Sequence, residues 1–210
     1  MISAQEVLAR LQDGNGRFVA GLQSEESRPN HLRRAMTAER QSPFAIILGC
    51  SDSRVPAEIV FDQGLGDLYV IRVAGNIVAP SQIGSVEFAA TNFGTPLVVV
   101  LGHTQCGAIL ATLEYLKQGS PQEHSENSRS IVERIRPAVE NLLEENGADD
   151  LIALSESAMR ANVEASVDQL KHGSNILEQL INKEELQIVG AEYSLETGAV
   201  EFLKSAGPGE

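Results

Sequence analysis

Five residues in two short stretches of this chain carry side chains suited to metal-ion and acid–base chemistry. Cys50, Asp52 and Arg54 occupy alternate positions of one segment, and His103 and Cys106 lie three positions apart further along the chain. Alternate residues of extended backbone point to one side, and residues three apart share a face if a helix begins there. We therefore expect two thiols, an imidazole and a carboxylate to converge on one small volume.

This set of donors is typical of a zinc site, because thiolate and imidazole are the ligands that zinc prefers in proteins. If Asp52 fills the fourth position, the metal is enclosed by protein. If water fills it, zinc lowers the pKa of that water from ~15.7 to ~7 and supplies hydroxide at neutral pH. A two-pronged hydrogen bond from Arg54 would hold Asp52 away from the metal, where it can orient the hydroxide. We predict a metal site at Cys50, His103 and Cys106, with Asp52 as a fourth ligand or as the partner of Arg54.

The elements that must position these residues have the pattern of buried strands. Apolar runs at residues 44–48 and 97–101 end at Gly49 and Gly102, directly before Cys50 and His103. Runs this short and this apolar are typical of strands that are buried on both faces. In a parallel sheet both runs would end at the carboxyl edge, where open α/β sheets place their ligand crevice.

The rest of the chain completes an α/β pattern. Further strands are expected at residues 68–71, 186–191 and 199–203, with helical segments between the first four strands and a short turn before the last. The predicted fold class is therefore α/β: a central, mostly parallel sheet of four strands plus an antiparallel edge strand, flanked by helices. The segment Arg72-Val73-Ala74-Gly75-Asn76 places an arginine and a glycine at the same edge of that sheet, as part of the crevice or as a simple turn.

Helix signals frame this sheet. Ser3 and Glu6 form a capping box before a first helix, which we expect Gly14-Asn15-Gly16 to interrupt. A short helix is expected within 31–41, and residues 128–185 are helical in period with Pro137 as the one strong breaker. No long linker divides the chain, so a single domain over residues 1–210 is expected.

Composition limits the class of function. With 42% hydrophobic residues, 210 residues can bury one sizeable core. The net charge of −13 argues against a nucleic-acid groove or an anionic membrane surface as partner. No apolar run approaches the roughly 18 residues of a membrane span, and the first residues lack the pattern of a secretory signal. We expect a soluble, cytoplasmic protein, in which a disulfide between the two cysteines would be unusual.

The motif Cys50-Ser51-Asp52-Ser53-Arg54, followed by His103-x-x-Cys106, resembles that of the β-class carbonic anhydrases. The likeness extends over roughly residues 4–203 and includes four further segments: Val55-Pro56-Ala57-Glu58, Arg72-x-Ala74-Gly75-Asn76, Gly84-Ser85-Val86-Glu87-Phe88 and Gly190-Ala191-x-Tyr193-x-Leu195-x-Thr197-Gly198. The paired cysteine motifs are highly specific to this family.

The resemblance implies a zinc enzyme that interconverts carbon dioxide and bicarbonate by attack of zinc-bound hydroxide. It implies that Cys50, His103 and Cys106 hold the metal and that Asp52 and Arg54 form a catalytic dyad. It further implies a homodimer or homotetramer, with an N-terminal helical arm of about residues 1–41 packed on a neighbouring subunit.

The resemblance also suggests a substrate pocket and a branch of the family. It assigns Gln41, Phe88 and Gly107 to substrate binding, with Gln41 contributed from across the dimer interface as in plant-like members. Another branch has a tryptophan three residues before the first cysteine and a regulatory bicarbonate pocket. This chain has Ile47 there and no tryptophan. We therefore expect the plant-like branch, without that pocket and with Asp52 paired with Arg54.

Three alternatives remain open. A hydrolase of carbon disulfide or carbonyl sulfide from the same family would have a similar metal site and differ in substrate access. A non-catalytic zinc protein would take all four ligands from the chain, so that the metal only stabilises the fold. A thiol redox protein is disfavoured, because the two cysteines form no Cys-x-x-Cys pair.

Overall fold

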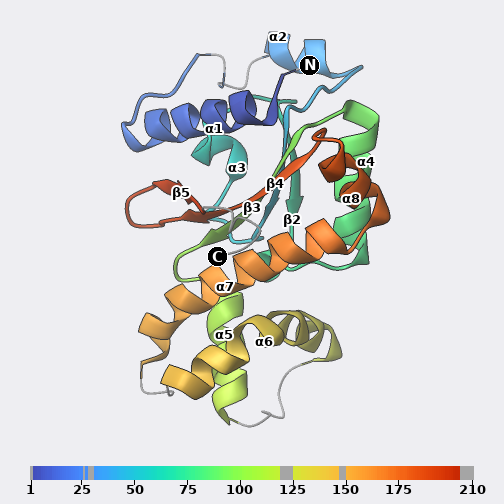
Figure 1. The fold of residues 1–210 in the computed structure, drawn as a ribbon. Helices are drawn as coiled ribbons and strands as arrows, with labels where there is room; N and C mark the ends of the chain where they lie inside the picture. Colours follow the sequence, from blue (N-terminus) through green and yellow to red (C-terminus); the bar gives the residue numbers. More distant parts are fainter. Residues whose placement is uncertain (1, 26, 28–30, 119–124, 147–149, 204–210) are drawn as a thin grey trace.

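The computed structural model describes residues 2–25, 27, 31–118, 125–146 and 150–203. Its centre is a five-stranded sheet in the order β2-β1-β3-β4-β5, in which the first four strands are parallel and β5 pairs antiparallel with β4 (Figure 1). The predicted fold class is confirmed. The strands are β1 Ala45–Gly49, β2 Leu68–Arg72, β3 Leu97–His103, β4 Gln187–Tyr193 and β5 Val200–Phe202.

Helices cover both faces of the sheet, because the central strands β1 and β3 are apolar over residues 45–48 and 97–101 and are buried on both faces. In β1, Ala45 and Ile47 face the helices α1 and α3, whereas Ile46 and Leu48 face α4, α7 and α8 on the other side. Every residue of β1 and β3 is buried. The covering helices are α1 Ala4–Val19, α3 Ala57–Val60, α4 Pro80–Phe93, α7 Leu151–His172 and α8 Asn175–Asn182.

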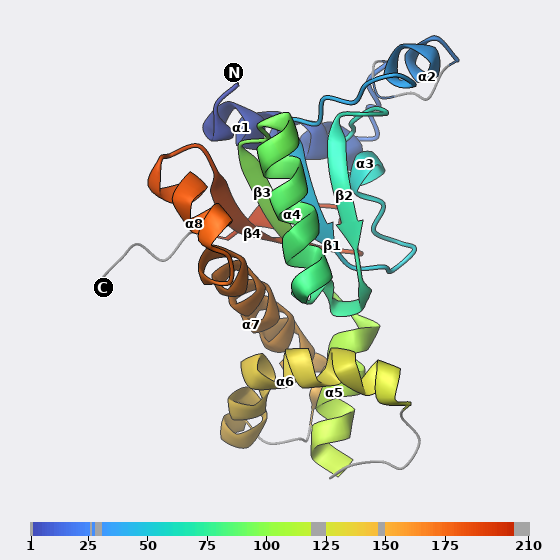
Figure 2. The same ribbon diagram turned by 90° about the vertical axis from the view of Figure 1, so that its right-hand side faces the viewer.

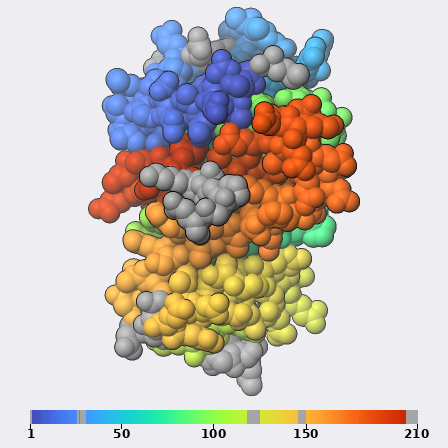
Figure 3. Space-filling model, viewed as in Figure 1, coloured from blue at the N-terminus to red at the C-terminus, as the bar shows by residue number. Residues whose placement is uncertain are grey.

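A layer of helices extends beyond the carboxyl edge of the sheet. It consists of α5, which spans Gly107–Gln118, α6, which spans Glu126–Asn146, and the first half of α7 (Figures 1 and 2). Helix α7 belongs to this layer with its first half and packs on the sheet with its second half. On the side shown in Figure 3, the layer and the sheet with its covering helices therefore form one continuous surface. The two segments that carry the predicted metal ligands, residues 50–54 and 103–106, lie where the layer meets the sheet. The turn η1, Ala74–Asn76, follows β2 at the same edge.

Helix α1 differs from the sequence-based expectation. The capping box of Ser3 and Glu6 is present as predicted, but the helix runs without interruption through Gly14-Asn15-Gly16. Gly14 lies directly on α3, where a Cβ atom would come within 1.9 Å of the carbonyl oxygen of Phe61. Asn15 is buried, and its side chain donates to the carbonyl of Val60 and accepts from Val200 N–H. These residues therefore serve close packing and not a turn.

The sequence-based expectations for α6 and α2 have different outcomes. Pro137, the helix breaker that the sequence predicts, lies inside α6. It sits on the exposed face, while Ile135 and Val139 anchor the opposite face in the core, so packing outweighs the one lost backbone hydrogen bond. A short helix within 31–41 is confirmed as α2, His31–Thr37, which stands apart from the sheet and has no buried residue (Figure 2).

Candidate metal centre

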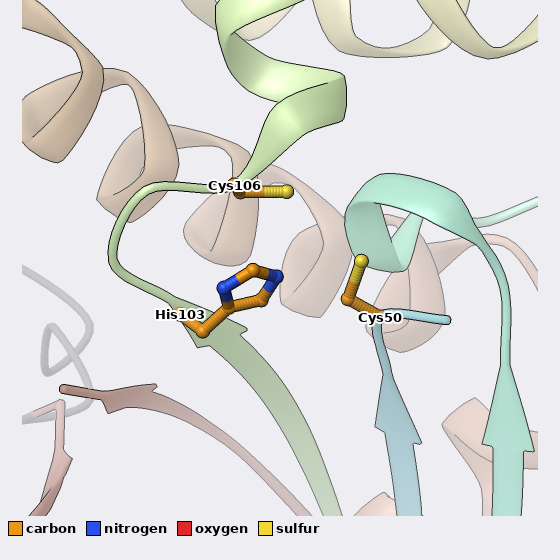
Figure 4. Close-up of side chains that lie close together, drawn as sticks. All are labelled: Cys50, His103 and Cys106. Carbon is orange, nitrogen blue, oxygen red and sulfur yellow. The ribbon is translucent and has the colours of Figure 1, made fainter. Parts of the chain in front are cut away.

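The fold brings Cys50, His103 and Cys106 together at the carboxyl edge of the sheet. Cys50 follows β1 and His103 is the last residue of the neighbouring parallel strand β3, so both emerge at the same edge. The three donor atoms all lie within 4.8 Å of one another, and the side chains point toward a common centre (Figure 4). The exposed fractions of the three residues are 5%, 0% and 2%. A group of this kind, shielded from bulk water, can hold a metal ion.

A turn, and not a helix face, brings Cys106 to this centre. Helix α5 begins at Gly107, so His103 and Cys106 do not share a helical face as the spacing suggested. Gln105 has a φ of 56°, which reverses the chain between them. Thr104 ties this turn to β4, because its N–H donates to the carbonyl of Tyr193 and its hydroxyl accepts from Leu195 N–H at 3.0 Å each. Sequence analysis missed Thr104, since a threonine gives no sign of such a role.

The orientation of His103 fits a metal ligand. Its Nδ1 lies 2.9 Å from the carbonyl oxygen of Thr104. A carbonyl only accepts, so Nδ1 carries the proton and Nε2 is left with a lone pair. Nε2 is buried and has no hydrogen-bond partner within the described part of the chain. A backbone carbonyl on the second ring nitrogen is the usual arrangement behind a metal-bound histidine.

A contact between the two thiols shifts their pKa values in opposite directions. The pKa of Cys50 is lowered chiefly because the thiol of Cys106 donates a hydrogen bond to it, with further help from the N–H of Gly75, while burial opposes the shift. The same contact and burial raise the pKa of Cys106. A divalent cation bound by both sulfurs would displace the thiol protons.

Asp52 and Arg54 lie at the edge of this cluster. The backbone turns at Asp52, whose carbonyl accepts from Val55 N–H, so the segment is not extended as expected. Arg54 donates to the carboxylate from Nε at 2.9 Å, from Nη2 at 2.7 Å and from its backbone N–H at 2.9 Å. These bonds hold the pKa of Asp52 well below its usual range. Its Oδ2 lies 4.0 Å from Nε2 of His103, so an ionised carboxylate adjoins the three donors without being one of them.

Arg72 holds the same loop from the side of β2. Its Nε donates to the carbonyl of Cys50 at 3.0 Å and its Nη2 donates to the carbonyl of Asp52 at 2.5 Å. The sequence placed Arg72 at this edge without assigning it a role. The structure shows that it fixes the backbone that carries both Cys50 and Asp52.

Cys50, His103 and Cys106 are called the metal cluster below. Of the residues expected to bind substrate, only Gly107 adjoins this cluster within the chain, directly after Cys106. Gln41 precedes β1 and thus lies at the opposite edge of the sheet, in a groove of about 790 Å³ that Arg34 and Phe93 also line. Phe88 is half exposed on α4, where its ring packs against Tyr69 and Phe93.

Comparison with known proteins decides the family. A family profile described as carbonic anhydrase matches residues 45–200, which include every residue of the metal cluster. The chain belongs to the β-carbonic anhydrase family. The carbonic anhydrase of Mycolicibacterium smegmatis is 41% identical over 197 residues, which cover 94% of this chain and 92% of that protein. Carbonic anhydrase 2 of Mycobacterium tuberculosis is also 41% identical, over 90% of this chain and 87% of its own length.

Solved structures of β-carbonic anhydrases share the fold. The enzyme CafA of Aspergillus fumigatus aligns with a TM-score of 0.74 at 22% identity, over 97% of this chain and 92% of that one. A structure from a study of two tetrameric β-carbonic anhydrases of Sordaria macrospora gives a TM-score of 0.71 at 24% identity, over 80% and 84% of the two chains. The family membership makes this chain a carbonic anhydrase, a lyase by reaction class. Within its described residues, the protein has no helix with the length and apolar character to cross a bilayer.

Proposed function

We propose that this chain is a zinc-dependent carbonic anhydrase in which Cys50, His103 and Cys106 hold the metal and Asp52 and Arg54 form the catalytic dyad. The observation that carries the proposal is the buried Nε2 of His103, which has no hydrogen-bond partner among the described residues and lies within 4.8 Å of both thiol sulfurs. Two thiolates and one imidazole suit zinc better than the hard cations magnesium and calcium, which prefer oxygen ligands. Zinc bound there supplies a water of lowered pKa and thus hydroxide near neutral pH.

Asp52 and Arg54 supply the direction of attack. Because Arg54 keeps Asp52 ionised, its carboxylate can only accept hydrogen bonds, and its Oδ2 faces the cluster from 4.0 Å. A hydroxyl that donates to this oxygen has its proton turned toward Asp52 and its lone pairs free for carbon dioxide. Arg54 therefore acts on the reaction through Asp52. The same pairing, together with Ile47 in place of a tryptophan, supports the plant-like branch without a regulatory bicarbonate pocket.

The substrate pocket would be completed by a second copy of the chain. Gln41 and Phe88 lie away from the cluster of their own chain, so they can act only on that of a partner. Helix α1 packs on its own sheet through the buried Val7 and Leu11. The part of the N-terminal arm that would cover a neighbour is therefore α2 with its flanks. Assembly into a homodimer or homotetramer agrees with the tetrameric enzymes described for Sordaria macrospora.

The test combines metal content with stopped-flow hydration of carbon dioxide between about pH 6 and 9. The purified wild type is expected to hold close to one zinc ion per chain and to hydrate carbon dioxide, whereas Cys106→Ala should lose the metal and the activity together. Wild-type protein that holds zinc but hydrates no carbon dioxide would contradict the proposal.

The same preparation separates the alternatives. Faster turnover of carbon disulfide than of carbon dioxide would favour the related hydrolase. A structural zinc ion with four ligands from the chain would leave no site for small anions, so neither azide nor cyanide would bind. Inhibition of carbon dioxide hydration by either anion is the expected result.

A further inference from the structure

We propose that Asn162, in the middle of α7, is a positioning residue for the metal centre that acts through the turn η1. The inference rests on the proposed function, because it concerns the metal that Cys50 would bind. Asn162 lies 87 positions from the turn that it contacts, and no motif in the sequence singles it out.

The turn η1 presents a hydrogen-bond donor to one of the metal-binding sulfurs. The backbone N–H of Gly75 points at Sγ of Cys50 across 3.4 Å. An N–H bond to a thiolate stabilises the negative charge on sulfur and so controls how much charge the sulfur gives to a bound metal. The direction of this one N–H is therefore part of the metal site.

The conformation of η1 allows only glycine at this position. Gly75 has a φ of 70°, and a Cβ atom there would lie 2.8 Å from Cδ1 of Ile135 and 3.1 Å from Cβ of Ala108. Helices α5 and α6 thus press the turn against the sheet edge. The next residue, Asn76, also has a positive φ, of 43°. Two successive residues in this sparsely populated region persist only where surrounding contacts hold them.

Helix α7 supplies those contacts. Nδ2 of Asn162 donates to the carbonyl of Gly75 at 2.8 Å, and one helical turn later the hydroxyl of Ser166 donates to the carbonyl of Asn76 at 3.2 Å. Both side chains come from residues that are almost fully buried, with exposed fractions of 2% and 3%. The two bonds fix the peptide planes that follow Gly75, and with them the direction in which its own N–H can point.

A purely structural role for Asn162 makes a different prediction. Buried carbonyls need donors, so removal of Asn162 would in either case lower the stability of the fold. Only a positioning role also predicts a change at the sulfur of Cys50. The test must therefore read metal binding and fold stability separately.

The experiment compares Asn162→Ala with Ser155→Ala. Ser155 is a buried polar residue of the same helix, but its hydroxyl donates to the carbonyl of Ile152 within α7 and not to a carbonyl of η1. Zinc-loaded wild type and both variants are mixed with a chromophoric chelator, and the rate of zinc transfer is measured. Melting temperatures are recorded for the zinc-free and zinc-loaded forms, and cobalt-loaded forms give the energy of the sulfur-to-metal charge-transfer band.

Asn162→Ala is expected to bind zinc about 10–100-fold more weakly, with faster transfer to the chelator. Its charge-transfer band should shift to lower energy, because the sulfur loses a hydrogen bond. Ser155→Ala should lower the melting temperature without changing zinc transfer or the band. An Asn162→Ala protein with a lower melting temperature but wild-type zinc transfer and band energy would overturn the positioning role of Asn162. That result would not contradict the proposed carbonic anhydrase function. If the wild type binds no zinc, the proposed function itself fails.

A second measurement covers the case in which Asn162→Ala does not fold. Wild-type protein labelled with nitrogen and loaded with an NMR-active isotope of cadmium should show scalar coupling between the metal and the amide proton of Gly75, transmitted through Sγ of Cys50. Coupling to this amide supports the proposal. Its absence in a cadmium-loaded, folded protein would show that no such hydrogen bond exists.

Discussion

Backbone groups next to each functional side chain decide what that side chain can do. The carbonyl of Thr104 takes the Nδ1 proton of His103 and leaves the other nitrogen free for a metal. The N–H groups of Gly75 and Arg54 point at the sulfur of Cys50 and the carboxylate of Asp52. Each of these contacts stabilises one protonation state. The same residue types without the surrounding turns would not form a site that can bind a metal ion.

The dyad can be tested with a pair of matched arginines. Arg54 and Arg160 are about equally exposed, with side-chain fractions of 51% and 48%, and each forms a 2.7 Å ion pair with a mostly buried carboxylate. Only Arg54 adjoins the metal cluster. We expect Arg54→Ala to lower the turnover of carbon dioxide by about a hundredfold, because Asp52 loses its fixed direction. Zinc content should stay unchanged, since the hydrogen bonds of the Arg54 side chain go to Asp52 and the carbonyl of Gln105 and not to Cys50, His103 or Cys106.

Stopped-flow hydration and metal analysis of both variants provide the measurement. Arg160→Ala should keep wild-type turnover, because its ion pair with Glu192 includes none of the residues proposed for the metal site or the dyad. Normal turnover in Arg54→Ala would remove the orientation of Asp52 from the mechanism, and loss of zinc would make Arg54 part of the metal site.

At the scale of elements, packing decides where helices continue and where they end. In α1, Gly14 and Gly16 flank the buried Asn15, and both have a helical conformation. A Cβ atom on Gly14 would lie 1.9 Å from the carbonyl oxygen of Phe61, whereas a Cβ atom on Gly16 meets nothing within 4 Å. The same substitution at two positions two residues apart should therefore act in opposite directions.

We expect Gly14→Ala to destabilise the fold by about 1–3 kcal/mol, because α1 or α3 must shift to admit the methyl group. Gly16→Ala should stabilise it by about 0.5–1 kcal/mol, since alanine loses less backbone entropy in a helix. Equilibrium unfolding in urea gives both values. Equal effects of the two substitutions would show that α1 does not pack on α3 as described.

The sequence was most informative for the strands and least informative for contacts between distant segments. The runs at residues 44–48 and 97–101 are apolar at every position. A short, fully apolar run is typical of a strand that is buried on both faces, so both strands could be predicted. The glycines of α1 were misread because local patterns cannot show which element lies opposite. Asn162 escaped notice for the same reason, since a polar residue in an amphipathic helix gives no sign that its partner is a turn far away in the chain.

The whole molecule, as a single copy, leaves its proposed active site incomplete. The metal cluster is buried at the carboxyl edge of the sheet, while Gln41 lies beyond the amino edge. Helix α2 extends from the body without a buried residue, and its Leu32 and Met36 are 62% and 73% exposed. Leu32 and Met36 lie four positions apart on α2 and so form one small exposed apolar patch. The proposed assembly would cover them and bring Gln41 to the metal cluster of a partner.

A charge at Met36 tests this assembly against an equally exposed position elsewhere. Ile152, in the first turn of α7, is 74% exposed and belongs to the helical layer beyond the opposite edge of the sheet. Met36→Glu should weaken self-association at least about tenfold, because a carboxylate would lose its hydration in the contact. Ile152→Glu should leave the assembly intact. Sedimentation over a range of concentrations measures the mass, and carbon dioxide hydration in the same samples should fall with dissociation while bound zinc is retained. Dissociation by Ile152→Glu, with Met36→Glu still assembled, would place the interface on the helical layer and leave α2 without the proposed role.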